Sequence, residues 1–309
     1  VMNASLAYLV FSRTTAQFDA AQQTRHALQL SGLTVVLDEA FRAMGSFAGF
    51  IPLLATESPA PHAEDLAVRL GGILGEHGPL LAIEWGFEAV HLFTAGPDPT
   101  PQLSWPRGRA APPVGTMIRD ASAGESPRGL IACNPGCAQL VAAPVLEHGR
   151  TAGVLLVEQS VADSLKAFHM LSGADIAVLQ SSQNDRPGGR WLDGWQRSLA
   201  SLTHAERVTP VVQVLSERFD LAVLIGQRQR FQHAGRWYEA FAVPPAEEFP
   251  GLEMLVLNDI STEMKAIHAA TRDSVLVGLA GLLLSELILL AALWGPLRRI
   301  RGVAQALPL

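Results

Sequence analysis

The chain has 309 residues, of which 49% are hydrophobic and 17% charged, and its formal net charge is -6. Its mean hydropathy of +0.22 is high for a soluble protein of this length, so we expect part of the chain to contact lipid. The negative charge, without clusters of Lys and Arg on one face, argues against a nucleic-acid-binding protein.

The first residues form an apolar stretch, VMNASLAYLVF, at positions 1–11. We interpret it as the end of a first transmembrane helix. A signal peptide is the alternative, but it requires a basic start and a small-residue cleavage site, and neither is present. Apolar residues then recur at helical spacing over 12–55, which predicts a long membrane-exit helix that mediates dimerisation and ends or kinks at Pro52.

Residues 56–160 are predicted to form a membrane-distal module with an antiparallel sheet, because turn sequences separate its short apolar runs. The sequence EHGR at 147–150 predicts the best-defined hairpin, and Pro144 predicts an edge strand or a bulge. The predicted elements are a helix over Glu64–Leu74 that closes at Gly75, and strands over Leu80–Phe93, Gly129–Cys133, Gln139–Leu146 and Thr151–Val157.

Residues 161–261 are predicted to form a second, membrane-proximal module of the same kind, with a hairpin turn at HAGR, 233–236. The predicted helices are Val161–Leu171, one that contains Trp191 and Trp195, and one around Val211–Glu217. The predicted strands are Ala174–Leu179, Leu221–Gln227, Gln229–His233, Arg236–Val243 and Leu252–Leu257.

A connecting helix over 262–273 is predicted to continue without a break into a transmembrane helix over 274–294, which has the length needed to cross a bilayer. Arginines at 298, 299 and 301 follow it directly, so the positive-inside rule places the C-terminus in the cytoplasm and residues 12–273 outside. Glu286 lies within this span. It is a candidate for a signalling or dimer-register role, or it is protonated or bonded to Ser285 or to its twin in a dimer.

Two cysteines, Cys133 and Cys137, flank the turn sequence Asn-Pro-Gly and are predicted to form a local structural disulfide. A redox or metal switch is the alternative. The nine histidines are scattered, so no metal site is predicted. The sequence lacks a Gly-rich phosphate loop, HExxH and GxSxG, and we therefore predict neither an active site nor a cofactor.

Aromatic residues of the first module suggest a ligand site. On the predicted strand, Trp85, Phe87 and His91 are separated by even steps and would share one face. With Arg107 or Arg119 beside them they would suit a small carboxylate. Ordinary core packing is the competing interpretation.

These elements, in this order, resemble the double Cache family of bacterial extracytoplasmic sensor domains. The resemblance rests on PRGLIACNPGCAQLVAAPVLEHGRTAGVLLVEQSVADSLKAF at 127–168 and LSGADIAVLQ at 171–180. It implies an α+β fold with a long N-terminal helix, two PAS-like antiparallel-sheet modules and a C-terminal transmembrane helix. The residue pattern by which amino-acid-binding members hold their ligand is not recognisable here.

The last residues, GPLRRIRGVAQALPL at 295–309, resemble the start of a HAMP linker, and ALPL is similar to what precedes GGDEF and EAL domains. The resemblance implies a homodimeric receptor of the bacterial inner membrane, whose periplasmic region senses a small molecule and controls cyclic-di-GMP turnover. The alternatives are the sensor of a histidine kinase or chemoreceptor, a module that binds a periplasmic protein, and an exported enzyme tethered by one helix.

Overall fold

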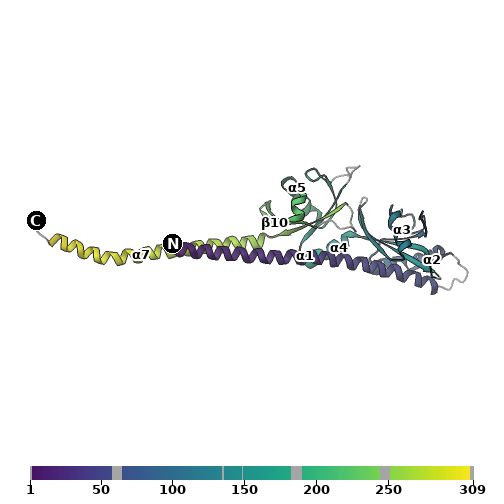
Figure 1. Ribbon diagram of the computed structural model, residues 1–309, viewed down its shortest axis with the longest axis horizontal. Helices are drawn as coiled ribbons and strands as arrows, with labels where there is room; N and C mark the ends of the chain where they lie inside the picture. The colour runs from purple at the N-terminus through teal and green to yellow at the C-terminus, as the bar shows by residue number, and fades with distance from the viewer. Residues whose placement is uncertain are drawn as a thin grey trace. The chain divides into compact units, whose positions relative to one another are not determined.

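The computed structural model describes residues 2–57, 65–133, 136–147, 149–181, 190–243 and 251–306. The chain divides into two units, one of residues 1–28 and 259–309 and one of residues 29–258. Figure 1 gives the order of the elements along the chain.

The first unit is helical and contains the start of α1 (Met2–Glu57) and all of α7 (Ser261–Ala306). An ion pair of 3.1 Å between Arg25 and Glu263 joins the two helices. In the described part of the chain, one helical stretch, Ser261–Trp294, is long and apolar enough to cross a membrane. An 18-residue window of this stretch has a mean hydropathy of 2.4, and none of the window is buried. It contains the predicted span at 274–294. The side chains of 1–11 and 295–309, where a first span and a HAMP linker are predicted, lie outside the described residues.

The second unit begins with the remainder of α1 and a five-stranded sheet in the order β2-β1-β5-β4-β3. Neighbouring strands pair antiparallel, as the turn sequences predict. Its elements are α2 (Leu66–Trp85), β1 (Ala89–Thr94), β2 (Pro101–Trp105), α3 (Gly115–Gly124), β3 (Arg128–Cys133), β4 (Cys137–Glu147) and β5 (Arg150–Ser160).

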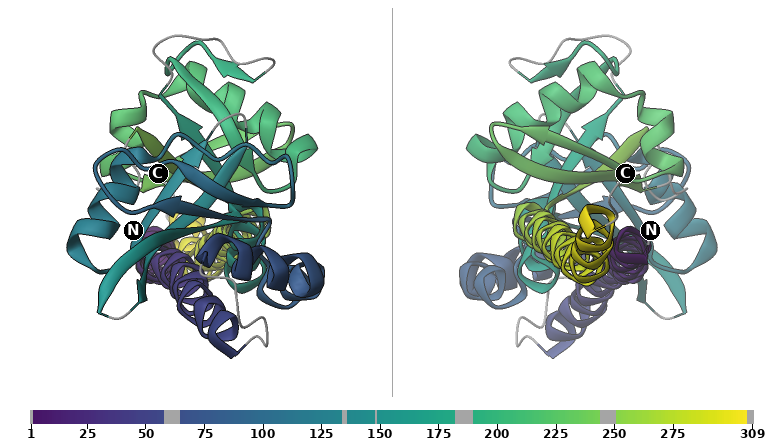
Figure 2. Two further views of the ribbon diagram at one scale, coloured as in Figure 1. Left: turned by 90° about the vertical axis from the view of Figure 1, so that its right-hand side faces the viewer. Right: turned by 90° about the vertical axis from the view of Figure 1, so that its left-hand side faces the viewer.

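Each face of this sheet is covered by helices. Phe47 and Ile51 of α1 and Leu70 of α2 pack with Leu92 on one face, and Figure 2 shows these two helices on the same side of the sheet. On the other face, α3 places Ile118 against strand residues such as Phe93. Successive residues of a strand point to opposite faces of the sheet. Because helices cover both faces, the burial along β1 and β5 is nearly continuous.

The first helix of this module is longer than predicted. It begins at Leu66, passes Gly75 and ends at Trp85, so the predicted strand over Leu80–Phe93 is wrong in its first half. Pro79 did not stop the helix, and its ring is on the exposed side. The short helix α3 was not predicted, because its ten residues include two glycines and show no long apolar repeat.

The EHGR hairpin is confirmed, since Glu147 pairs with Arg150 across the turn. The strand with Pro144 lies between β5 and β3 and is not an edge of the sheet. However, β3 pairs only as far as Ala142, so Pro144 lies beyond the last β3 pair and needs no N–H on that side. A register shift follows at Val145, as predicted for a bulge.

The second sheet has six strands in the order β7-β8-β6-β11-β10-β9. The hairpin at His233–Arg236 is confirmed, with Ala234 and Gly235 at positive φ of 47° and 75°. The elements are α4 (Val161–Ser172), β6 (Asp175–Gln180), β7 (Trp191–Leu192), β8 (Arg197–Leu202), α5 (Ala205–Arg218), α6 (Leu221–Gly226), β9 (Gln229–His233), β10 (Arg236–Val243) and β11 (Leu252–Asp259).

The second sheet also has helices on both faces. Val212 and Leu215 of α5 and Leu224 of α6 pack on one face. Phe168 of α4 packs on the other face with Leu37 of α1. The linking helix α4 therefore belongs to a core that includes both α1 and the second sheet.

Two predictions for this module are wrong. Trp191 is in a short strand and Trp195 is in the following turn, so the two residues do not share a helix face. The indole of Trp195 donates a hydrogen bond to the carbonyl of Phe219 (2.7 Å). The predicted strand over Leu221–Gln227 is the helix α6. The short apolar sequence of this segment is compatible with a strand or a helix, and burial of Leu224 against the sheet favours the helix. Strand β8 was not predicted.

Candidate functional site

A cleft of about 1000 Å³ lies on the α3 side of the first sheet and reaches the ends of strands in the second sheet. Its lining combines apolar side chains with charged and polar groups. The polar residues among those that line it are Glu88, Arg109, Glu158, Ser160, Gln180, Ser181 and Ser201.

The wall of this cleft contains a buried charge. Glu158 is 4% exposed and accepts a hydrogen bond from Nε2 of His91, which is fully buried (2.8 Å). The other imidazole nitrogen, Nδ1, lies 2.8 Å from the hydroxyl of Ser104. Both ring nitrogens are thus engaged, so the imidazole is held in one orientation.

The register of the sheet produces this contact. Ala89 pairs with Glu158 across β1 and β5, and His91 follows two residues later on the same face. On its other side, His91 pairs directly with Ser104 of β2. The His91 side chain therefore lies between its two partners.

Arg109 completes the group at the surface of the cleft. Its side chain is 48% exposed, and its NH2 lies 3.3 Å from Oε2 of Glu158 and 3.9 Å from Oε2 of Glu88. Burial raises the pKa of the Glu158 carboxyl, but the hydrogen bonds and charges of His91 and Arg109 outweigh burial and hold that pKa below its usual value. Glu158 is therefore ionised at neutral pH.

The structure does not bring the four predicted ligand residues together. Trp85 ends α2 and contacts Phe47 and Phe50 of α1, on the sheet face opposite to His91. The prediction that Trp85 and His91 share a strand face is wrong, because the strand begins only at Ala89. His91 contacts the cleft through Glu158.

The two predicted arginines lie outside the residues that line the cleft. Arg107 is exposed in the turn after β2, and Arg119 is exposed on α3, where it donates to Thr116 (3.1 Å). The cleft is instead lined by Arg109, two residues after Arg107. Sequence reasoning missed Arg109 and Glu158, since neither stands in a motif and their contact depends on the fold.

Cys133 and Cys137 form a disulfide across the β3–β4 connection. Both are buried and also line the cleft. The carbonyl of Cys133 accepts a hydrogen bond from Gln180 of the second sheet (2.9 Å). The disulfide therefore lies where the two sheets of residues 29–258 meet. The turn residues Asn134 and Pro135 lie outside the described residues.

Glu286 is exposed on α7 within the candidate membrane span. Its predicted signalling or dimer-register role stays a prediction.

Among the described residues, one group of side chains could hold a metal ion: His169, Asp175 and His204. The histidines are 35 positions apart, so spacing along the sequence gave no signal of this group.

The model of one protein family, the double sensory domain of two-component sensor kinases (dCache_3), matches residues 69–258, which is more than half of the chain. The chain belongs to the double Cache family. The matched range includes both sheets, the cleft and the disulfide. The double Cache region is thus an extracytoplasmic sensor domain and not a catalytic one, as the sequence predicts.

Three solved structures illustrate the similarity. The sensor domain of the Vibrio cholerae histidine kinase DctB is 14% identical, with 79% of this chain and 98% of that one covered and a TM-score of 0.44. The GABA-bound ligand domain of the Pseudomonas aeruginosa chemoreceptor PctC is 13% identical (76% and 100% covered, TM-score 0.40). A domain of a putative sensory box/GGDEF protein from Vibrio parahaemolyticus is 9% identical (78% and 97%, 0.43). At these values the similarity supports no argument about ligand or output. No curated protein matches the chain.

Proposed function

We propose that this double Cache domain senses a small carboxylate that binds in the cleft at Arg109. The observation that carries the proposal is the buried, ionised Glu158 behind a half-exposed arginine. A guanidinium offers a fork of N–H donors that matches a carboxylate. Glu158 holds one nitrogen of Arg109 at 3.3 Å and thereby positions this fork at the cleft. Arg109 is the binding residue in this proposal, and Glu158 and His91 are positioning residues.

Binding of carboxylates to the full chain in lipid nanodiscs tests the proposal. We would screen short mono- and dicarboxylates by thermal unfolding, since a ligand at about 100 times its Kd stabilises the folded state by about 2.7 kcal/mol. We expect Arg109→Gln to abolish the shift. Arg119→Gln, which changes an exposed arginine outside the cleft lining, is the matched control and should keep it. A shift that survives in Arg109→Gln, or no shift with any carboxylate at millimolar concentration, would contradict the proposal.

We further propose that the domain acts within a homodimeric inner-membrane receptor. Residues 12–273 would lie in the periplasm, 274–294 would cross the membrane, and a ligand would change the register or tilt of α7. Large apolar side chains that stay exposed on α1, such as Leu28 and Val35, support a helix-mediated dimer. The unbroken run of α7 from Ser261 to Ala306 supports transmission along one helix.

For the output, we propose cyclic-di-GMP synthesis or hydrolysis through a HAMP linker that opens at 295–309. The support is the resemblance of GPLRRIRGVAQALPL and the family phrases at 127–180. Sequencing the coding region beyond codon 309 tests this step. A HAMP continuation followed by GGDEF or EAL motifs would support it. A phospho-acceptor histidine helix would show the histidine-kinase alternative, and an immediate stop codon would contradict transduction.

A partner-binding module without a small ligand is the second candidate. It is favoured by apolar side chains that remain exposed on α2, Val68, Leu80 and Ile83, of which Leu80 and Ile83 are neighbours on the helix surface, because exposed apolar patches mark protein contacts. The carboxylate screen distinguishes the two candidates, since a partner-binding module predicts no carboxylate shift.

A further inference from the structure

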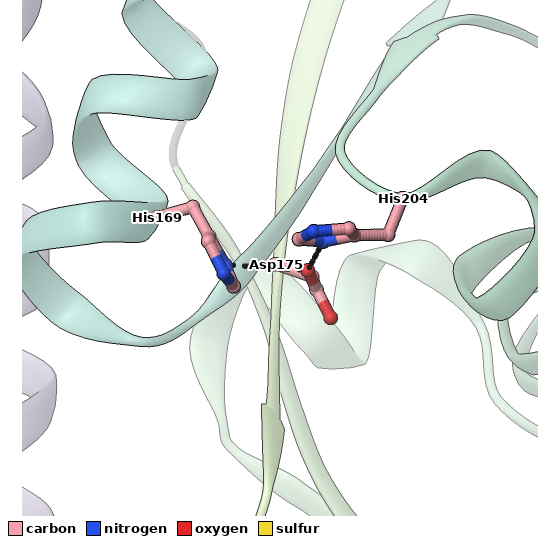
Figure 3. A group of neighbouring side chains, drawn as sticks. All are labelled: His169, Asp175 and His204. Atoms are coloured by element: carbon pink, nitrogen blue, oxygen red, sulfur yellow. Dashed lines mark hydrogen bonds and ion pairs between the residues drawn. The ribbon is translucent and has the colours of Figure 1, made fainter.

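We propose that His169, Asp175 and His204 form a binding site for a divalent transition metal ion of the Zn²⁺ class in the second sheet module. One ligand atom from each residue lies within 4.8 Å of the others. Two imidazoles and one carboxylate, with water at the remaining positions, form a ligand set that suits such ions. Figure 3 shows both imidazoles beside the Asp175 carboxylate.

The fold brings the three residues together from three elements. Asp175 is the first residue of β6, and β8, its antiparallel neighbour, ends at Leu202, which pairs with Ala177. His204 follows two residues after that end and so lies beside Asp175. His169 is in the last turn of α4, which ends at Ser172 and is capped by Gly173 with a positive φ of 69°, and the chain then turns directly into β6.

The distances are close to those between ligands of one metal ion, with His204 nearer to Asp175 than a tetrahedral ion requires. Nδ1 of His169 lies 3.4 Å and Nδ1 of His204 lies 2.9 Å from Oδ1 of Asp175. Two ligands bound at about 2.1 Å to a tetrahedral ion are about 3.4 Å apart. The two rings are 4.5 Å apart, centroid to centroid, and nearly perpendicular at 71°. Small side-chain rotations would therefore suffice to direct all three groups at one ion.

The second carboxylate oxygen has its own partner. NH2 of Arg207 lies 2.7 Å from Oδ2 of Asp175, and it also contacts Oδ1 at 2.9 Å. Thr203 donates a further hydrogen bond to Oδ1 (3.0 Å). The same nitrogen lies 3.2 Å from Nδ1 of His204, so Arg207 must withdraw from His204 and from Oδ1 when an ion binds. It can keep its bond to Oδ2, and such outer partners orient metal ligands in general.

The competing interpretation is a hydrogen-bonded cluster that stabilises the start of β6. His169 Nδ1 also lies 2.9 Å from the carbonyl of Ala174, and metal binding through this atom would break that hydrogen bond and leave the proton of the neutral imidazole on Nε2. Two features favour a ligand site. The side chains are accessible, with exposed fractions of 26%, 14% and 51% for His169, Asp175 and His204. In addition, His204 adopts a left-handed backbone (φ 43°) that is uncommon for a non-glycine residue.

The position of the site gives metal binding a consequence. An ion would connect the linking helix α4, strand β6 and the residue before α5. Asp175 pairs with Leu257 of β11, and four residues after Leu257 the chain enters α7. Metal binding would therefore restrain the strand pair from which α7 continues. This inference does not depend on the proposed carboxylate, which binds in a different part of residues 29–258.

Zinc binding to the full chain in nanodiscs, purified without a histidine tag, tests the inference. We expect saturable binding of one Zn²⁺ per chain by calorimetry, weakened at least about tenfold by His169→Gln or by His204→Gln. His77→Gln is the matched control, because His77 is also an accessible histidine beside a carboxylate, 3.8 Å from Glu76. Its zinc affinity should equal that of the wild type.

A second measurement on the wild-type chain does not depend on how the variants fold. Zn²⁺ should protect His169 and His204 from carbethoxylation, read by mass spectrometry, and leave His77 reactive. The inference is overturned if the wild type shows no saturable binding, if both glutamine variants bind zinc as the wild type does, or if zinc protects neither His169 nor His204. Carboxylate shifts measured with the same samples test the proposed function separately.

Discussion

The Glu158 carboxylate shows how single residues define the candidate site. It is buried, and burial of a charge is unfavourable unless hydrogen bonds and opposite charges compensate for it. His91 and Arg109 supply both. Neither residue could be matched with Glu158 from the sequence, because the contact depends on the register of β1 against β5 and on the loop after β2.

The first prediction concerns the pH dependence of stability. The folded-state pKa of Glu158 lies below its usual value of 4.5, so its ionised form contributes stability that is fully present above that value and is lost as the pH falls through the lower folded pKa. We expect Glu158→Gln to reduce the unfolding free energy by about 1–3 kcal/mol at pH 7. The difference from the wild type should shrink below about pH 4.5.

Chemical denaturation of both proteins between about pH 3 and pH 7 measures that difference. Glu88→Gln is the control, because Glu88 is half exposed and lies 3.9 Å from the same Arg109. Its effect should stay below about 0.5 kcal/mol. If the difference in unfolding free energy between the wild type and Glu158→Gln does not depend on pH, the lowered pKa of Glu158 is contradicted.

At the scale of elements, α2 shows why a local stop signal was misread. Gly75 marked the expected helix end, yet the helix continues because Leu70, Leu74 and Gly78 face the first sheet. Gly78 permits the indole of Trp105 to pack against the helix, since a Cβ at this position would lie 2.5 Å from Trp105 Cε2. The tertiary contact with β2 therefore extends the helix beyond its local breakers.

Two of the glycines of α2, Gly75 and Gly78, should respond in opposite directions to alanine. Gly78→Ala is expected to destabilise by about 1–3 kcal/mol, because the indole must shift in a packed core. Gly75→Ala should stabilise by about 0.5–1 kcal/mol, since Gly75 has open space around its Cα and alanine favours the helix. Urea unfolding of both variants compares them, and equal effects would show that Trp105 does not pack here as described.

At the scale of the whole molecule, the helix α7 connects the sensor domain to the candidate span. The topology that we propose places α5 outside the cell membrane and residue 301 in the cytoplasm. We expect Glu217→Cys, an exposed position of α5, to react with a membrane-impermeant maleimide in cells with a permeabilised outer membrane. Arg301→Cys should react only after the inner membrane is opened.

The native cysteines do not interfere with this labelling, because Cys133 and Cys137 are joined in the disulfide. Detergent-treated cells, in which both variants should be labelled, serve as the control. Labelling of Arg301→Cys in cells with an intact inner membrane would contradict the proposed orientation.

The sequence by itself determined the class of the protein. Turn residues at 147–150 and 233–236 gave both hairpins, and the apolar run at 274–294 gave the candidate span. These features depend on short-range physics: positive φ in a tight turn, alternation along a strand, and the length of an apolar helix. The family resemblance added the double Cache family, and the family match confirms it.

Only the tertiary structure decided which side chains meet. It placed Trp85 and His91 on opposite faces of one sheet, brought Arg109 to Glu158, and gathered His169, Asp175 and His204. Each grouping joins residues that are distant in sequence or come from different elements. Strand register and helix ends set these contacts, and both result from the burial of whole faces, which no local pattern specifies.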